Sequence, residues 1–185
     1  MLGLIFAILL IILALTPRSE NQNQPSMSLL PRLTPQKKAD ISQFGLDIPK
    51  INVWAPIIPQ VNGYDKEAYL KAIESGVAQF KDTKNPDELG NLFLFGHSKY
   101  YREKPGDYKE VFKELNQLKA KDEFNIYYKG EKIAYTVTES KKVDQYDWSI
   151  MDPTPDNPQD KTITIMTCWP PGTTDARWVL FGKQK

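Results

Sequence analysis

The sequence predicts a mainly β domain, a barrel or sandwich that carries a few short helices. Two observations favour this fold class: many short strand-like runs of apolar residues, and only two segments with a helical pattern. The region from about residue 44 to the end has roughly 140 residues, which is the commonest size for a single domain. One domain with one core is therefore expected at 44–185.

The first half of this region predicts two strands with a helix between them. Residues 48–58 alternate apolar and other side chains, and their prolines place this strand near a sheet edge. Residues 65–75 carry Ala68, Leu70 and Ile73 and stop at Gly76, which is typical of a short helix. Residues 92–96 form a brief apolar run, read as a buried strand.

The second half predicts a helix followed by four strands. Residues 108–120 carry an apolar stripe and favour a second helix; the stripe consists of Val111, Phe112, Leu115 and Leu118. Residues 124–128 and 132–138 flank Lys129-Gly130-Glu131 and predict a hairpin. Three prolines exclude regular structure from 151–160, and long loops of this kind are often functional. Strands at 162–167 and 177–181 finish the domain.

The chain begins with an apolar run, which we interpret as a membrane anchor at residues 1–16. As a helix, Met1–Leu15 would reach only about 22 Å of the ~30 Å hydrocarbon core. Two alternatives are a cleavable signal peptide and an anchor whose beginning is missing. No Lys or Arg precedes the run and Pro17 follows it, which favours an anchor over a signal peptide and suggests an incomplete N-terminus.

Residues 17–43 predict a flexible polar stalk. The segment is polar, rich in Gln, Asn and Ser, with scattered prolines. Such a composition buries too little apolar surface to offset the entropy lost on ordering. A stalk after an anchor implies a target that is also outside the membrane.

The composition excludes several classes of site. With one cysteine and one histidine, the chain has no intramolecular disulfide and no zinc site made of several cysteines. The net charge of +1, without a basic stripe, gives no reason to expect nucleic acid as a partner. We expect neither a metal nor a cofactor.

Three residues can carry thiol chemistry. Cys168 ends the strand-like run 162–167, and His97 ends the run 91–96. A thiol attacks a carbonyl as the thiolate, so an imidazole must take its proton and a cation must hold the anion. Arg177 opens the strand that follows Cys168, and if the two strands are antiparallel neighbours it returns beside the thiol. A buried structural cysteine, a core histidine and a solvent-facing arginine remain the alternative interpretation.

Several motifs resemble the sortase family in the same order along the chain. Thr164-Ile165-Met166-Thr167-Cys168 is similar to the Thr-Leu-x-Thr-Cys signature, and Arg177 falls where several sortase classes carry an arginine. Gly90–Ser98 resembles the segment that ends in the Gly-His of the family, and Asp47–Ile57 resembles its opening strand. The match covers roughly residues 47–182, but it does not assign a sortase class.

The resemblance implies a sortase-like eight-stranded β-barrel with short helices and a cysteine transpeptidase. Cys168 would be the nucleophile that forms a thioester with an LPxTG-like sorting signal, His97 the acid and base, and Arg177 the group that holds the carbonyl and the oxyanion. The acceptor would be an amine of a cell-wall precursor or of a pilin lysine. The protein would sit in the bacterial cell membrane through a single span, with domain 44–185 outside the cytoplasm.

Two further substrate contacts are expected with less support. Thr167 lies next to the nucleophile, and Trp169 either lines the sorting-signal groove or covers the barrel end. Residues 100–109 form a charged, aromatic stretch, either an insertion on the substrate side or a solvated loop, and the sequence favours the loop.

Two other functions compete with transpeptidation. A cysteine peptidase would only hydrolyse, although papain-like enzymes place cysteine before histidine, the reverse of the order here. An L,D-transpeptidase would carry its histidine close to the cysteine in sequence, which this chain does not. A catalytically silent surface-binding β-domain would keep Cys168 buried and far from His97 and Arg177.

Overall fold

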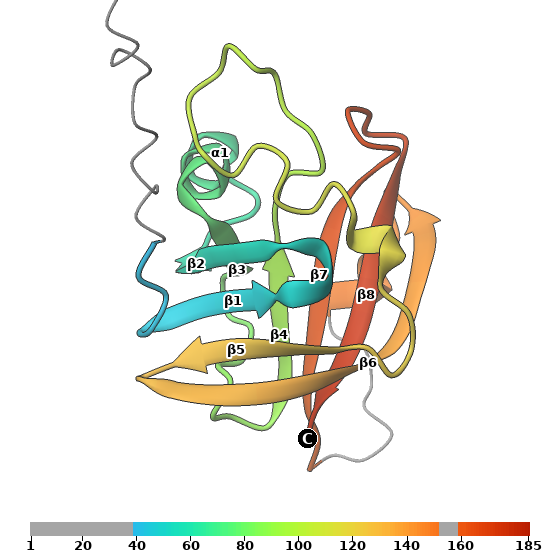
Figure 1. Ribbon diagram of the computed structural model, residues 1–185. Helices are drawn as coiled ribbons and strands as arrows, with labels where there is room; N and C mark the ends of the chain where they lie inside the picture. The colour runs from blue at the N-terminus through green and yellow to red at the C-terminus, as the bar shows by residue number, and fades with distance from the viewer. Residues whose placement is uncertain (1–38, 152–158) are drawn as a thin grey trace, which may run out of the picture. The chain divides into compact units, whose positions relative to one another are not determined.

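The computed structural model describes residues 39–151 and 159–185, and within these ranges eight strands close into one barrel (Figure 1). The strands are β1 (Phe44–Ile48), β2 (Val53–Val61), β3 (Val77–Phe80), β4 (Gly90–Phe95), β5 (Glu123–Tyr128), β6 (Glu131–Asp144), β7 (Lys161–Trp169) and β8 (Ala176–Gln184). Their order is β1-β2-β3-β4-β7-β8-β6-β5, and β5 pairs back onto β1. The predicted mainly β, eight-stranded barrel is confirmed.

The directions of three neighbouring strands matter for function. Strand β7 lies between β4 and β8. Its pairing with β4 is parallel, whereas its pairing with β8 is antiparallel. The C-terminal ends of β4 and β7 and the start of β8 therefore meet at one end of the barrel, where the connection after β4 and the β7–β8 hairpin both emerge at the top of Figure 1.

Side chains alternate between the two faces of these strands, as the pleat requires. Leu92 and Leu94 of β4 point into the barrel, where they join the main core. Phe93 and Phe95 belong instead to a second apolar cluster outside the barrel, together with Val179 of β8. The outer face of β4, β7 and β8 is thus a second packed layer.

One of the two predicted helices is confirmed. Helix α1 (Lys66–Ser75) is N-capped by Asp65, whose carboxylate accepts hydrogen bonds from the backbone N–H groups of Glu67 and Ala68 at 3.0 and 3.1 Å. Single-turn 3-10 helices are found at η1 (Pro49–Ile51), η2 (Leu115–Gln117) and η3 (Trp148–Met151).

The helix predicted at 108–120 is wrong. The segment forms turns and then the short η2, held by i to i+3 hydrogen bonds such as Leu115 N–H to the Phe112 carbonyl at 3.2 Å. Three of its residues are fully buried against the main core: Phe112, Leu115 and Leu118. Their spacing of three matches the 3-10 period better than the 3.6 of an α-helix, so the segment closes a barrel end with apolar side chains in turn geometry.

The other predicted boundaries shift by a few residues. The first predicted strand begins with η1, and only from Val53 does the chain extend as β2. The hairpin is confirmed as β5 and β6, which pair from Glu123 opposite Thr136 to Tyr128 opposite Glu131. The apolar pattern did not predict strands β1 and β3. Most of the proline-rich loop, residues 152–158, lies outside the described residues.

The N-terminal predictions are only partly within the structure. The anchor at 1–16 and the stalk up to residue 38 lie outside the described residues. Residues 39–43 pack on the barrel rather than extending from it: Ile41 is buried, and the Trp54 indole donates to the Ala39 carbonyl at 2.8 Å. In the part of the chain that the structure describes, no helix is long and apolar enough to cross a membrane.

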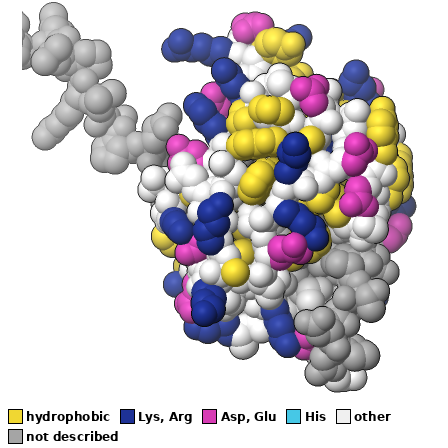
Figure 2. All heavy atoms as spheres, turned by 90° about the vertical axis from the view of Figure 1, so that its right-hand side faces the viewer, with side chains coloured by type: hydrophobic (Ala, Val, Ile, Leu, Met, Phe, Trp, Pro, Cys, Tyr) yellow, Lys and Arg dark blue, Asp and Glu magenta, His cyan; other side chains and the backbone are white. Residues whose placement is uncertain are grey.

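Figure 2 shows the face on the right of Figure 1, where β6 and β8 lie. Hydrophobic side chains gather over its upper part, and charged side chains of both signs surround them. This mixture agrees with a formal net charge of only +1.

Candidate active site

Cys168 and Arg177 lie directly opposite each other. The register of β7 and β8 pairs these two residues, which confirms the antiparallel neighbours expected from the short connection between them. Directly opposed residues in a sheet point to the same face. The Arg177 guanidinium is held by Nη1, which donates to the carbonyls of Thr174 at 3.0 Å and Ala176 at 2.9 Å. Its position beside the thiol is therefore fixed by backbone groups of the same hairpin.

His97 reaches Cys168 from the other side, through the parallel pairing of β4 with β7. The register ends with Phe95 opposite Met166, and the Gly96 N–H still donates to the Met166 carbonyl at 3.3 Å. Continued two residues further, this register sets His97 opposite Cys168 on the outer face of the sheet. The His97 carbonyl accepts a hydrogen bond from the Phe112 N–H at 2.9 Å, which connects the histidine to the segment that closes the barrel end.

At Gly96 there is little room for a side chain. A Cβ atom there would lie 3.0 Å from the Phe112 ring and 3.1 Å from a Val111 methyl group. The glycine lets the ring of Phe112 approach the chain just before His97. Gly96 thus allows the packing of Phe112, and this packing helps to position His97.

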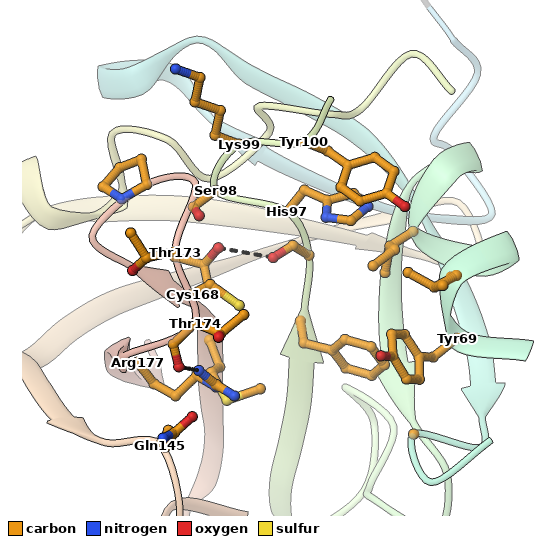
Figure 3. A pocket seen from close by; sticks show the side chains of 18 of the residues that line it. Tyr69, His97, Ser98, Lys99, Tyr100, Gln145, Cys168, Thr173, Thr174 and Arg177 are labelled. Atoms are coloured by element: carbon orange, nitrogen blue, oxygen red, sulfur yellow. Dashed lines mark hydrogen bonds between the residues drawn. The ribbon is translucent and has the colours of Figure 1, made fainter. Parts of the chain in front are cut away.

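The three residues line one groove of about 1300 Å³ (Figure 3). Its floor is the outer face of β4 and β7, with Phe95 and Met166. Helix α1, η3 and the β7–β8 hairpin form its walls. Figure 3 shows Cys168 between His97 on one side and Arg177 on the other. The groove is therefore large enough for an extended peptide across the thiol.

Burial opposes a charge on both His97 and Cys168. It lowers the pKa of His97 and raises the pKa of the Cys168 thiol, while the positive charge of Arg177 pulls the thiol pKa back down. At neutral pH the free site is therefore mainly neutral thiol and neutral imidazole. A thiolate can form when charge from Arg177 and a protonated His97 stabilise it.

The imidazole ring of His97 is held by stacking. The ring of Tyr100 lies parallel to it, with centroids 4.4 Å apart and an interplanar angle of 14°. The Nε2 atom of His97 is buried without a hydrogen-bond partner among the described residues. Stacking fixes the plane of the ring, and the buried Nε2 atom has a hydrogen-bonding capacity that no described residue uses.

Comparison with known proteins agrees with this geometry. The family model described as the sortase domain matches residues 46–185. The chain belongs to the sortase family. The family resemblance in the sequence is thereby confirmed, and the barrel with a groove over β4, β7 and β8 is its sortase domain.

Individual sortases are similar to this one. Sortase D of Bacillus subtilis strain 168 is 29% identical over 142 residues, which cover 75% of this chain and 62% of that protein. The Clostridium perfringens Sortase D5 transpeptidase has 26% sequence identity and a TM-score of 0.60, with coverage of 78% of this chain and 79% of that one. Sortase C2 of Group B Streptococcus Pilus Island 1 shares the fold, with a TM-score of 0.63, 22% identity and coverage of 80% and 77%.

Thr167 and Trp169 have different places in this sortase domain. Thr167 is buried at the groove, and its hydroxyl donates to the Gly96 carbonyl at 2.9 Å. It thereby links the strand of the cysteine to the residue before the histidine. Trp169 does not line the groove; its ring packs on Trp178, 5.0 Å between centroids, and Trp178 in turn packs against the main core. The geometry therefore favours covering the barrel end over contacting a sorting signal.

The stretch between His97 and η2 lies along the groove, not away from it. Seven of its residues line the groove: Ser98, Lys99, Tyr100, Tyr101, Arg102, Lys109 and Glu110. The sequence favoured a solvated loop because insertions at a protein surface cost little free energy. The aromatic residue three positions after the histidine was the available signal for Tyr100, but sequence alone does not distinguish stacking on His97 from exposure.

Proposed function

We propose that this protein is a cysteine transpeptidase that cleaves an LPxTG-like sorting signal and transfers the cleaved protein to an amine. The observation that carries the proposal is the position of Cys168 in one open groove between His97 and Arg177. A silent binding domain would have no reason to gather the only cysteine and the only histidine of the chain with an arginine in a groove.

In the first step the Cys168 sulfur attacks the carbonyl of the threonine in the signal. The S–C bond forms as the thiol proton goes to His97, and the C–N bond then breaks while His97 returns that proton to the leaving amine. A thioester and a free amine result. The lowered pKa of His97 suits this role, because its imidazolium gives up a proton readily.

In the second step an amine attacks the thioester carbonyl. The N–C bond forms, the C–S bond breaks, and His97 carries the proton lost by the amine to the departing sulfur. Arg177 faces the thiol in both steps and can hold the carbonyl oxygen as it becomes negative, since a guanidinium never loses its charge. Neither step needs a metal ion or a cofactor.

The cellular setting that we propose follows the sortase family. Residues 1–16 would anchor the protein in the bacterial cell membrane by a single span, and residues 17–38 would hold the catalytic domain outside the cytoplasm. The acceptor would be an amine of a cell-wall precursor or of a pilin lysine. A single cysteine suits this location, because no second thiol of the chain can trap it in an intramolecular disulfide.

The test is to incubate the full-length chain with a Leu-Pro-x-Thr-Gly-like peptide and to detect a thioester on Cys168 by mass spectrometry. Cys168→Ala should abolish the adduct, and Arg177→Gln should slow its formation by about 10²-fold, as expected for loss of an oxyanion-stabilising group. Arg102→Gln removes the same charge from the same groove and is the matched control; its rate should stay close to that of the wild type.

Two results separate the alternatives. Added amine should increase product formation at the expense of hydrolysis; hydrolysis that is indifferent to amine would instead indicate a cysteine peptidase. If no thioester forms with any peptide of a sorting-signal library, and Cys168 stays inert, the silent binding domain is the better description.

A further inference from the structure

A buried hydroxyl group beside His97 has no partner. Ser98 is 2% exposed, its Oγ atom makes no hydrogen bond within the described residues, and the residue lines the groove. A buried hydroxyl without a partner costs about 1–3 kcal/mol, so native proteins rarely keep one without a reason. Three other described residues have a buried polar side-chain atom without a partner. His97 also lines the groove, whereas Tyr135 and Gln184 do not, so the unpartnered hydroxyl of Ser98 belongs to the site.

The next residue adds a positive charge to the same rim. Lys99 is exposed, and its aliphatic stem approaches the β7–β8 hairpin, with Cδ 3.5 Å from where a Cβ atom on Gly172 would lie. It forms no ion pair with any residue that the structure describes. In the view of Figure 3, Ser98 lies between Lys99 on the rim and Cys168 below.

The groove as a whole attracts anions. Its lining includes five cationic residues, Lys66, Lys99, Arg102, Lys109 and Arg177, and two acidic ones, Glu110 and Asp147. One of the acids, Glu110, is already paired with Lys113 at 3.0 Å. A ligand that carries a carboxylate would therefore find an excess of positive charge there.

The chemistry decides which part of the reaction these two residues face. Arg177 holds the carbonyl side of the reacting centre, on β8. His97 must exchange a proton with the amine, so the amine lies on the side of β4, from which the chain continues directly into Ser98 and Lys99. Both residues are therefore placed for the amine rather than for the acyl part of the sorting signal.

We propose that Ser98 and Lys99 form the binding site for the amino nucleophile, and that this site selects an amine whose molecule also carries a free carboxylate. The proposal rests on the transpeptidase function above. The Ser98 hydroxyl accepts a hydrogen bond from an N–H of the amine and thereby orients the lone pair of the amine nitrogen toward the thioester carbonyl. His97 takes the proton released as the N–C bond forms and the C–S bond breaks. The Lys99 ammonium group pairs with the carboxylate at the rim.

The experiment uses the full-length chain with the thioester preformed on Cys168, and two acceptors that differ only in charge: glycylglycine and glycylglycinamide. Rates are compared per unprotonated amine. The wild type should react about fivefold faster with the free carboxylate, the size of a partly exposed ion pair. Lys99→Gln should bring this ratio to about one, and Lys99→Glu should reverse it. High salt should reduce the preference of the wild type.

Ser98→Ala gives a different signature. It should slow aminolysis by both acceptors about fivefold, through one lost hydrogen bond, and leave their ratio unchanged. Lys104→Gln, on the same connection but outside the groove lining, and Ser75→Ala, at the exposed end of α1, are the matched controls and should behave like the wild type.

The outcomes are distinguishable from failure of the proposed function. Absence of the thioester would overturn the transpeptidase proposal itself. A thioester that forms normally but reacts equally with both acceptors in the wild type would overturn the carboxylate preference alone. Unchanged aminolysis in Ser98→Ala would remove Ser98 from the amine site.

Discussion

The hydrogen bond from the Thr167 hydroxyl to the Gly96 carbonyl links the strands of Cys168 and His97 at positions next to both residues. It is 2.9 Å long, and Thr167 is 2% exposed. The backbone hydrogen bonds between the two strands end with the one from Gly96 N–H to the Met166 carbonyl, and this side-chain bond extends the contact toward His97 and Cys168. Thr167→Val removes the donor and keeps the branched shape of the side chain.

The expected effects on stability and on rate have different sizes. Loss of a buried hydrogen bond should lower the free energy of unfolding by about 1–2 kcal/mol. For a domain of this size that corresponds to a fall in melting temperature of ~3–8 °C. A displacement of His97 by about 1 Å can cost 10²-fold in rate, so thioester formation should fall by at least about tenfold.

Thr167→Ser is the control, because it keeps the hydroxyl and loses one buried methyl group. It should lose about 1 kcal/mol of stability, close to the loss in Thr167→Val, and yet form the thioester at nearly the wild-type rate. Thermal unfolding and stopped-flow mass spectrometry measure the two quantities. Equal rates of thioester formation in the two variants would refute the positioning role of Thr167, whatever their melting temperatures.

Three further predictions test the electrostatics and the core. The pH midpoint for alkylation of Cys168 by iodoacetamide should lie above that of a free cysteine, because burial raises the thiol pKa. Arg177→Gln should move the midpoint higher still, because the guanidinium lowers this pKa; an unmoved midpoint would contradict the contact between the two residues. Burial lowers the pKa of His97 from 6.5, so below that pH the unfolded chain binds a proton more readily than the folded chain, and the free energy of unfolding falls as pH falls. In urea unfolding, the decrease between pH 7 and pH 5 should be smaller for His97→Asn than for the wild type. Phe112→Ala should lower the free energy of unfolding by about 3–5 kcal/mol, because the ring is fully buried at the barrel end. Tyr146→Ala, at a 72% exposed position, should change it by no more than about 0.5 kcal/mol. Comparable losses in denaturant unfolding would refute the packing role of Phe112.

Local patterns predicted the parts of the fold that depend on neighbours in the sequence. The β5–β6 hairpin follows from the Lys-Gly-Glu turn between two strand-like runs, and α1 follows from its spaced apolar residues and its stop at Gly76. The contact of Cys168 with Arg177 belongs to the same class, because a short connection between two strands makes them antiparallel neighbours.

Other parts depend on tertiary contacts that leave little mark on the sequence. The apolar stripe that ends in Leu118 looks helical when the i, i+4 and i+7 positions are counted from Val111. The structure instead buries every third residue from Phe112 and sends the Phe112 N–H to the His97 carbonyl, outside the segment. A backbone donor engaged elsewhere cannot continue a helix, and no local pattern reports that engagement.

The position of His97 shows why a site can be harder to predict than its residues. Strands β4 and β7 are distant in the sequence, and two other strands, β5 and β6, come between them along the chain. Parallel strands end at the same edge of a sheet, so once β4 pairs with β7 the residues that follow both runs must meet there, and the antiparallel β8 must begin there. One parallel and one antiparallel pairing around β7 thus bring His97, Cys168 and Arg177 together. Because the chain continues from His97 over the groove, the same parallel pairing also brings Ser98 and Lys99 to the amine side of the thiol, which sequence spacing alone could not indicate.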